Sequence, residues 1–216
     1  MPLPLTIDLE KRLRVDVPRL ETDRLVLRGW RRADVERCQR VLNDPDVMRF
    51  MGAGPAYRAK RVLARAVSSF CAVEAARDLA RRSDHWREHG WGDWALELKR
   101  SGELIGRAGF ERLPDWTADE ADAELGWLLA RDAWGQGLAT EAARAMLDFG
   151  FTNLPLSRLV SIAFPDNQRS IRVMERVGFS LQGHTQWRGH EMVWYAIDRA
   201  VWRRGAGGPA QPASAS

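Results

Sequence analysis

A glycine-rich turn, Trp134-Gly135-Gln136-Gly137-Leu138, constrains the fold more than any other feature of the chain. It follows a strand pattern that ends near Leu129 and precedes a helix pattern with apolar residues from Ala139 to Leu147. Glycine reaches backbone angles that are closed to other residues, which lets its amides approach a ligand closely. Because a helix N-terminus adds partial positive charge, strand, glycine turn and helix together have the geometry of a phosphate or pyrophosphate site.

The same turn argues against two common nucleotide sites. An isolated Gly-x-Gly more often makes a tight strand-to-helix turn without a ligand. A Rossmann dinucleotide site places a third glycine three residues after the second, where this chain has Thr140. A Walker loop needs Gly-Lys-Ser/Thr, which is absent here. A nicotinamide-dependent oxidoreductase is therefore disfavoured, although it stays an alternative.

Strand and helix patterns alternate along the chain and predict a mixed α/β domain with one sheet. Ser101-Gly102 is expected to form a hairpin turn. The expected strands are 25–30, 91–98, 103–111, 121–129, 158–164, 179–186 and 191–197, and the expected helices are 33–42, 58 to about 82, 138–151 and 168–177. We place the domain at 19–202, between a loose leader at 1–18 and a tail at 203–216 whose small residues cannot bury apolar surface.

Composition excludes several classes of protein. A chain of 216 residues can bury a core without disulfides or metal, so Cys38 and Cys71 are expected to be reduced thiols. No apolar run approaches the roughly 20 residues that cross a bilayer, and the first ten residues lack the features of a signal peptide. Secretion and membrane insertion are disfavoured, and a cytoplasmic location is expected.

Charge and histidine spacing point away from nucleic acid and metal. The net charge of +4 is mild, and the basic stretch from Arg58 to Arg65 follows a helical pattern typical of a solvated face. The four histidines show no metal-ligand spacing with the two cysteines; they are His85, His89, His184 and His190. We therefore expect no nucleic acid and no metal.

Three motifs in order resemble the GCN5-related N-acetyltransferase (GNAT) family, and within it the branch typified by ribosomal-protein N-terminal acetyltransferases. They are Glu124-Leu125-Gly126-Trp127-Leu128-Leu129, the loop from Trp134 to Ala142, and Asn167-Gln168-Arg169-Ser170 leading to Glu175-Arg176-Val177-Gly178-Phe179. Glu21-Thr22-Asp23-Arg24-Leu25 and Gly102-Glu103-Leu104-Ile105-Gly106 also look like blocks of this family. The resemblance spans about residues 20 to 199.

The resemblance implies one twisted mixed sheet flanked by helices, with acetyl-CoA in a cleft where the parallel strands 121–129 and 158–164 splay apart. The pantetheine arm would pair like an added strand with the backbone of Trp127, Leu128 and Leu129. The pyrophosphate would lie on the loop formed by Gly135, Gln136, Gly137, Leu138, Ala139 and Thr140. The family often starts this loop with Gln or Arg, and Trp134 departs from that pattern.

Acetyl transfer to an amine needs a neutral amine, a polarised carbonyl and a stabilised thiolate. Glu124 is the candidate base, acting through water if partial burial raises its pKa; the alternative is an exposed carboxylate paired with an arginine. Ser170 is placed to donate a hydrogen bond to the CoA sulfur. Asn167 is expected to hold the pantetheine amides, to cap the following helix, or both. Many relatives carry a tyrosine acid where this chain has Met174, so Ser170 or solvent would be the acid.

The expected activity is acetyl-CoA-dependent transfer of an acetyl group to a primary amine by direct attack in a ternary complex. A noncatalytic acyl-CoA-binding module is the alternative. The acceptor, a protein N-terminus or a small-molecule amine, is not disclosed by the sequence, and a homodimer stays open. The acidic run of Asp115, Asp119, Glu120 and Asp122 suggests steering of a cationic amine, although a solvated loop is the commoner role of such a run.

Overall fold

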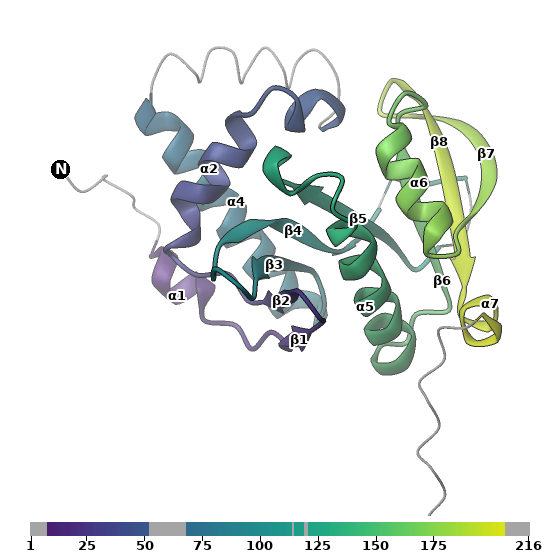
Figure 1. Ribbon diagram of the computed structural model, residues 1–216, viewed down its shortest axis with the longest axis horizontal. Helices are drawn as coiled ribbons and strands as arrows, with labels where there is room; N and C mark the ends of the chain where they lie inside the picture. The colour runs from purple at the N-terminus through teal and green to yellow at the C-terminus, as the bar shows by residue number, and fades with distance from the viewer. Residues whose placement is uncertain (1–7, 52–67, 114, 119–120, 206–216) are drawn as a thin grey trace, which may run out of the picture.

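The computed structural model describes residues 8–51, 68–113, 115–118 and 121–205, and its core is one eight-stranded sheet in the order β1-β2-β3-β4-β5-β6-β8-β7 (Figure 1). The strands are β1 Leu20–Glu21, β2 Leu25–Arg28, β3 Asp93–Leu98, β4 Leu104–Glu111, β5 Ala123–Leu129, β6 Arg158–Ala163, β7 Ser180–Trp187 and β8 His190–Asp198. The helices are α1 Leu9–Leu13, α2 Asp34–Asn43, α4 Ser68–His89, α5 Leu138–Asn153, α6 Gln168–Arg176 and α7 Arg199–Arg204, with short 3-10 turns η1 Val47–Phe50 and η2 Arg131–Ala133. The predicted mixed α/β class with a single sheet is confirmed.

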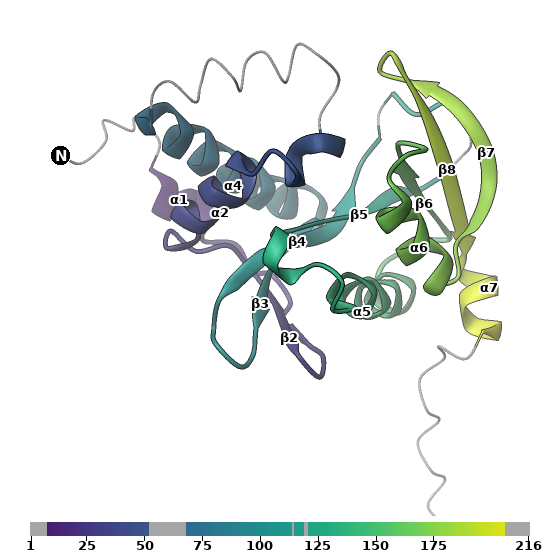
Figure 2. The same ribbon diagram turned by 45° about the horizontal axis from the view of Figure 1, so that its top comes forward.

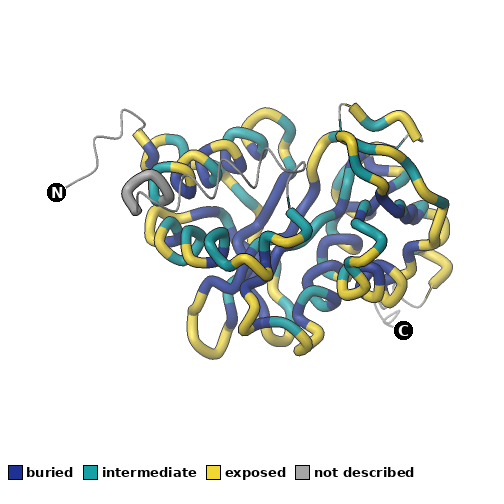
Figure 3. The backbone as a smooth tube through the Cα atoms, turned by 90° about the horizontal axis from the view of Figure 1, so that it is seen from above, coloured by how far each residue is buried: buried dark blue, intermediate teal, exposed yellow. Residues whose placement is uncertain are grey.

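Helices cover both faces of the sheet, which explains why its central strands are buried on both sides (Figures 2 and 3). On one face, Ala95 and Leu104 pack with Leu79 of α4. On the other, Trp94 and Phe110 join a larger core that includes the apolar stripe of α5. The alternation of side chains along β3 therefore assigns each neighbouring residue to a different helical layer.

Several predicted boundaries need correction. The long helix expected to end near Arg82 continues to His89, because Trp86 on its last turns is buried against Trp94. Its predicted beginning, at residues 58–67, lies outside the described residues. None of the helices in the described ranges is both long and apolar enough to span a membrane.

The two ends of the domain also differ from expectation. The segment predicted as a loose leader contains α1, whose Leu9 is buried against Ala76 and Ala80 of α4. Helix α7 extends past Trp202 to Arg204, and most of the predicted tail, residues 206–216, lies outside the described residues. Neither short helix has a strong apolar period, so the hydrophobic pattern did not predict them.

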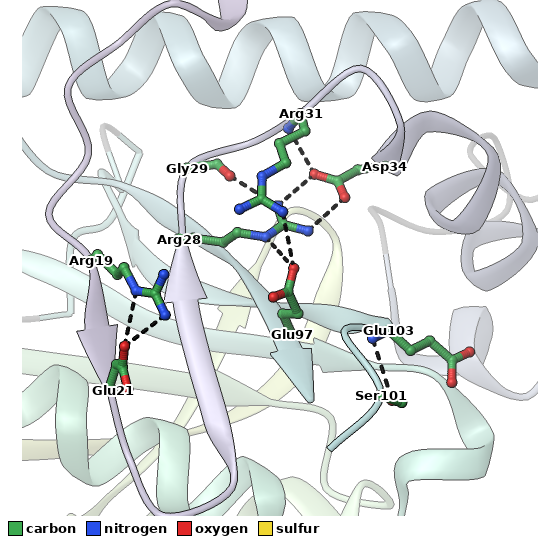
Figure 4. A network of polar contacts seen from close by, with 9 residues as sticks. All are labelled: Arg19, Glu21, Arg28, Gly29, Arg31, Asp34, Glu97, Ser101 and Glu103. Atoms are coloured by element: carbon green, nitrogen blue, oxygen red, sulfur yellow. Dashed lines mark hydrogen bonds and ion pairs between the residues drawn. The ribbon is translucent and has the colours of Figure 1, made fainter. Parts of the chain in front are cut away.

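A buried ion-pair network fixes the N-terminus of α2 (Figure 4). The guanidinium of Arg28 donates to both oxygens of Asp34 at 2.8 Å and to Glu97 of β3 at 2.6 Å, and the Arg31 amide also donates to Asp34. Arg28 and Asp34 are almost fully buried, and paired buried charges of this kind hold elements in one geometry. The network therefore sets the position of α2, which leads through Asp44 into η1.

The close approach of α5 to the sheet yields a stability prediction. Gly150 of α5 faces the ring of Phe110, and a Cβ added at Gly150 would lie 2.7 Å from Phe110 Cζ. We expect Gly150→Ala to destabilise the protein by about 1–3 kcal/mol in urea unfolding, because Phe110 is fully buried and cannot move aside. In a Phe110→Leu background the same change should cost less, because the ring that the new Cβ would meet is absent and alanine is the better helix former. An equal cost in both backgrounds would contradict this packing.

Candidate active site

The sheet opens between its two parallel strands. β5 and β6 pair through Ala123↔Leu159 and Glu124↔Val160 and no further, although β5 continues to Leu129. The backbone of β5 beyond Glu124 keeps its antiparallel partner β4 on one side and has no strand partner on the other. This gap can receive an extended ligand backbone in place of a strand.

A cavity of about 770 Å³ occupies the opening. Of the twelve residues predicted to bind or react, eleven line it: Glu124, Trp127, Leu128, Leu129, Gly135, Gly137, Leu138, Ala139, Thr140, Asn167 and Ser170. The exception is Gln136, whose carbonyl accepts from Arg24 at 2.8 Å and whose side-chain amide donates to the Asp132 carbonyl. The fold thus brings together segments of β5, the glycine turn and α6.

The glycine turn leaves backbone donors free. Gly135 (φ 74°) and Gly137 (φ 77°) adopt the left-handed conformation, and Gly137 is the N-cap of α5 with no side-chain cap. Within the described residues, none of the backbone amides from Gly135 to Thr140 donates a hydrogen bond. The hydroxyl of Thr140 is buried and has no partner among these residues, although Thr140 lines the cavity. Unpaired donors at a helix N-terminus fit an anion with several oxygens.

Beside the turn, the ring of Trp134 lies against the side chain of an arginine. The indole N–H of Trp134 donates to the Leu129 carbonyl at 2.9 Å, which fixes the ring. The guanidinium of Arg169, on the first turn of α6, lies 4.5 Å from the centre of that ring. Sequence reasoning missed Arg169, because only the fold places α6 against the glycine turn. The stacked arginine adds positive charge to the same end of the cavity.

Asn167 and Ser170 both line the cavity at the N-terminus of α6. Asn167 is the N-cap of α6, and its side-chain oxygen accepts from the Ser170 amide at 3.3 Å, so the predicted cap is confirmed. Ser170 lines the cavity, and its hydroxyl donates no hydrogen bond to a described residue. Met174, at the position of the family's tyrosine, is buried in the same wall. Tyr195 bonds to Glu175 and lies outside the cavity, and Tyr57 lies outside the described residues.

Glu124 is the carboxylate at the point where the strands part. Its side chain is half-buried and lines the cavity, and among the described residues no arginine lies within ion-pair distance of it. Burial raises the pKa of Glu124 to about 8, and the charge of Glu111 adds to the rise, while Arg107 opposes it. Among the described residues, Glu124 is therefore neither fully exposed nor paired with an arginine.

A second carboxylate faces Glu124 across the sheet. Glu111 of β4 is the register partner of Glu124, and like charges at such positions repel each other. Burial acts to raise the pKa of Glu111, but Arg107 and Arg82 outweigh it, and the net pKa of Glu111 is lowered. Arg82 lies 3.2 Å from Glu111, and both arginines also contact the buried Asp93. The pKa of Glu124 is thus raised and that of Glu111 is lowered, a pattern typical of acid–base sites.

Two of the four residues in the acidic run expected to steer a cation, Asp115 and Asp122, have local partners. Asp115 forms a two-bond pair with Arg188 at the tip of the β7–β8 hairpin. Asp122 accepts from the backbone amides of Ser157 and Arg158, so it ties the beginnings of β5 and β6 together. Asp119 and Glu120 lie outside the described residues. The structure thus gives Asp115 and Asp122 local partners and offers no support for steering by them.

Apolar and aromatic side chains also line the cavity. They include Met48, Phe50, Phe164, Trp187, His190 and Met192. Phe164 lies 6.2 Å from the ring of Phe50 and 5.4 Å from that of His190, which joins η1, the end of β6 and β8 in one row. Sequence analysis did not identify Phe50, Phe164 or His190, because the row exists only across strands.

Comparisons with known proteins agree on one family. The family model described as acetyltransferase (GNAT) domain matches residues 24–180. The uncharacterized N-acetyltransferase p20 of Bacillus licheniformis is 29% identical over 165 residues, which cover 76% of this chain and 83% of the relative. The uncharacterized protein YkkB of Bacillus subtilis is 33% identical over 166 residues, with coverage of 74% and 84%. The crystal structure of the acetyltransferase from Agrobacterium tumefaciens has a TM-score of 0.64 and 30% identity, and covers 86% of this chain and 96% of that one.

The pairing of the two carboxylates predicts a titration. Glu111→Gln should move the pKa of Glu124 down from about 8, because it removes a negative charge from the facing position. The shift should be less than about one unit, since Glu111 is half-exposed and screened by water. Carboxyl-carbon NMR across pH 4–10 measures it. Glu103→Gln, which changes a similarly exposed carboxylate at the other end of β4, is the matched control; equal shifts in both variants would contradict the coupling.

Proposed function

Since the chain belongs to the GNAT family of N-acetyltransferases, we propose that it transfers an acetyl group from acetyl-CoA to a primary amine by direct attack in a ternary complex. The observation that carries the proposal is the single cavity wall shared by a base-like carboxyl group, an open strand backbone and a turn of free amides. These are the three parts that the reaction requires.

The donor half of the cavity suits coenzyme A. Free amides from Gly135 to Thr140 and the stacked Arg169 match a pyrophosphate, and the open edge of β5 at Trp127–Leu129 matches the amides of a pantetheine arm. The ribosomal L7/L12 alpha-N-protein acetyltransferase RimL, solved in complex with coenzyme A, shares the fold with a TM-score of 0.66 and 18% identity. Acetyl-CoA would supply the activated acyl group, and Asn167 and Ser170 would hold its arm and sulfur.

Glu124 is the proposed base. Its raised pKa makes the ionised form of Glu124 a stronger base, which accepts a proton from an ammonium acceptor, directly or through a water in the cavity, as pH rises through about 8. The Ser170 hydroxyl is the proposed donor toward the departing sulfur, with solvent as the alternative. A covalent intermediate on Cys38 is disfavoured, because that thiol lies outside this cavity and burial raises its pKa to about 12.

The lining of the cavity favours an amine acceptor whose remaining part is neutral or apolar. In the part of the chain that the structure describes, four carboxylates line the cavity, and all except Glu124 are paired with arginines: Asp46 with Arg131, and Asp93 and Glu111 with Arg82 and Arg107. The spermidine N(1)-acetyltransferase of Escherichia coli is 34% identical over 77 residues, or 36% of this chain. A polyamine needs several unpaired carboxylates, so we favour a protein N-terminus, as in the ribosomal-protein branch, or a small monoamine.

Two broader expectations accompany this proposal, and one alternative competes with it. The domain would extend from residue 19 to 202, with α1 and α7 packed at its ends. A cytoplasmic setting would supply both acetyl-CoA and ribosomal or metabolic amines. The alternative, a noncatalytic acyl-CoA-binding module, would bind the donor and release no thiol with any amine.

The base assignment predicts the behaviour of Glu124→Gln. Thiol release from acetyl-CoA should be measured with peptide N-termini, monoamines and polyamines across pH 6–9. We expect wild-type kcat to rise as pH increases through about 8, because the base acts when deprotonated. Glu124→Gln should lower kcat about 10²-fold and remove that rise, with acetyl-CoA affinity unchanged. Wild-type turnover in this variant would make Glu124 a structural residue, and no thiol release with any amine would favour the binding module.

The phosphate-loop assignment predicts the behaviour of Gly137→Val. Valine is strained at the φ of 77° found there, so the backbone should leave the left-handed conformation and turn its amides away. We expect calorimetry to show at least about a tenfold loss of acetyl-CoA affinity. Gly102→Val imposes the same strain (φ 68°) at a hairpin turn outside the cavity and should leave the affinity unchanged. Unchanged affinity in a folded Gly137→Val protein would refute the assignment.

A further inference from the structure

We propose that Thr22 and Arg24, at the turn between β1 and β2, are positioning residues for the donor: through Glu141 and the Gln136 carbonyl they hold the glycine turn in the shape that binds a pyrophosphate. The inference rests on the proposed function, because it assumes that the turn receives the pyrophosphate of acetyl-CoA. It gives a role to the Glu21–Leu25 segment, which lies far from the cavity in sequence and does not line it.

The β1–β2 turn is itself rigid. The Thr22 amide donates to the Leu25 carbonyl at 3.0 Å, and the Leu25 amide donates back to the Thr22 hydroxyl oxygen at 2.9 Å. The Arg24 carbonyl accepts from the Lys99 amide at 2.9 Å, which ties the turn to the end of β3. These bonds hold the backbone of Thr22 and Arg24 in place relative to the sheet.

Both residues converge on one carboxylate. Glu141, in the first turns of α5, accepts from the Thr22 hydroxyl at 2.5 Å, the Arg24 amide at 2.8 Å and the Arg24 Nε at 2.6 Å. Its side chain is mostly buried, and burial acts to raise its pKa, but the bonds from Thr22 and Arg24 outweigh burial and lower it. Glu141 therefore stays ionised, and its oxygens accept charge-assisted bonds on its buried side while Arg24 is itself half-exposed.

Arg24 also reaches the glycine turn directly. Its Nη1 donates to the Gln136 carbonyl at 2.8 Å, so one guanidinium bridges the start of α5 and the turn that precedes it. The peptide bond between Gln136 and Gly137 is trans, and in a trans peptide the N–H points opposite to the C=O. Holding the Gln136 carbonyl toward Arg24 therefore directs the Gly137 amide to the other side of the turn, and Gly137 lines the cavity.

This arrangement makes Arg24 an indirect participant. Arg24 and Glu141 do not line the cavity, and the charge of Arg24 is balanced by Glu141, so neither is placed to touch the donor. Their effect acts through the orientation of backbone amides, which bind an anion well only when they are already aligned. The contribution should therefore be felt by donors that carry a pyrophosphate and not by donors that lack one.

The test compares two thioesters, acetyl-CoA and acetyl-pantetheine, which lacks the pyrophosphate. In Arg24→Met we expect KM for acetyl-CoA to rise about tenfold, with KM for acetyl-pantetheine and for the amine within about twofold of wild type. Glu141→Gln should show the same donor-specific loss, and the double variant should lose little more than either alone. Arg24→Lys, which keeps the charge beside Glu141, should restore part of the loss.

Arg19→Met is the matched control, because Arg19 forms an exposed pair with Glu21 on β1 and has no contact with the glycine turn. It should leave both thioesters unaffected. Equal loss with both thioesters in a folded Arg24→Met protein, or the same loss in Arg19→Met, would overturn the positioning role and leave the phosphate loop standing. A wild-type enzyme that uses the two thioesters equally well would remove the phosphate loop and this inference with it.

Discussion

The pairing of β5 with β6 stops after two residues, and the rest of the site depends on that interruption. An uninterrupted parallel pair would consume the backbone groups of β5 and leave no room between the strands. Asp122 fixes the closed end by accepting from the Ser157 and Arg158 amides, and beyond Glu124 the strands separate. The sheet thus contains an unfilled strand position in its middle, which an extended ligand can occupy without exposing a new edge.

The raised pKa of Glu124 also depends on the place where β5 and β6 separate. As the last β5 residue with a partner in β6, it is held rigidly by the sheet while its side chain enters the cavity. Its cross-strand neighbour Glu111 is kept ionised by Arg82 and Arg107, so the negative charge of Glu111 raises the pKa of Glu124. Glu111 remains charged because Arg82 and Arg107 lie beside it, whereas Glu124 has no arginine within ion-pair distance among the described residues. Strand register, more than any single contact, creates this difference in proton affinity.

The sequence predicted what local chemistry determines. The strand before the glycine turn and the helix after it were expected within two residues of their observed ends, because Gly135 and Gly137 mark the turn and the α5 stripe is strongly periodic. It did not disclose contacts that depend on register or on packing between distant segments. The Glu111–Glu124 pair needs the β4–β5 register, Arg169 needs α6 against Trp134, and Gln136 turns its carbonyl to Arg24 instead of lining the cavity. Helix α4 ran past its expected end because burial of Trp86 overrode local propensity.

The bond between Thr22 and Glu141 joins residues 119 positions apart in the chain. Contacts of such long sequence separation have a large loop-closure entropy cost. They therefore form after the local hairpins and helices, whose contacts close shorter loops. The glycine turn therefore has its full set of supports only when the first strands have docked against α5, near the completion of folding. A nascent or partly unfolded chain with an intact α5 would still lack an organised anion site, so the ability to hold the donor reports on the whole domain and not on one motif.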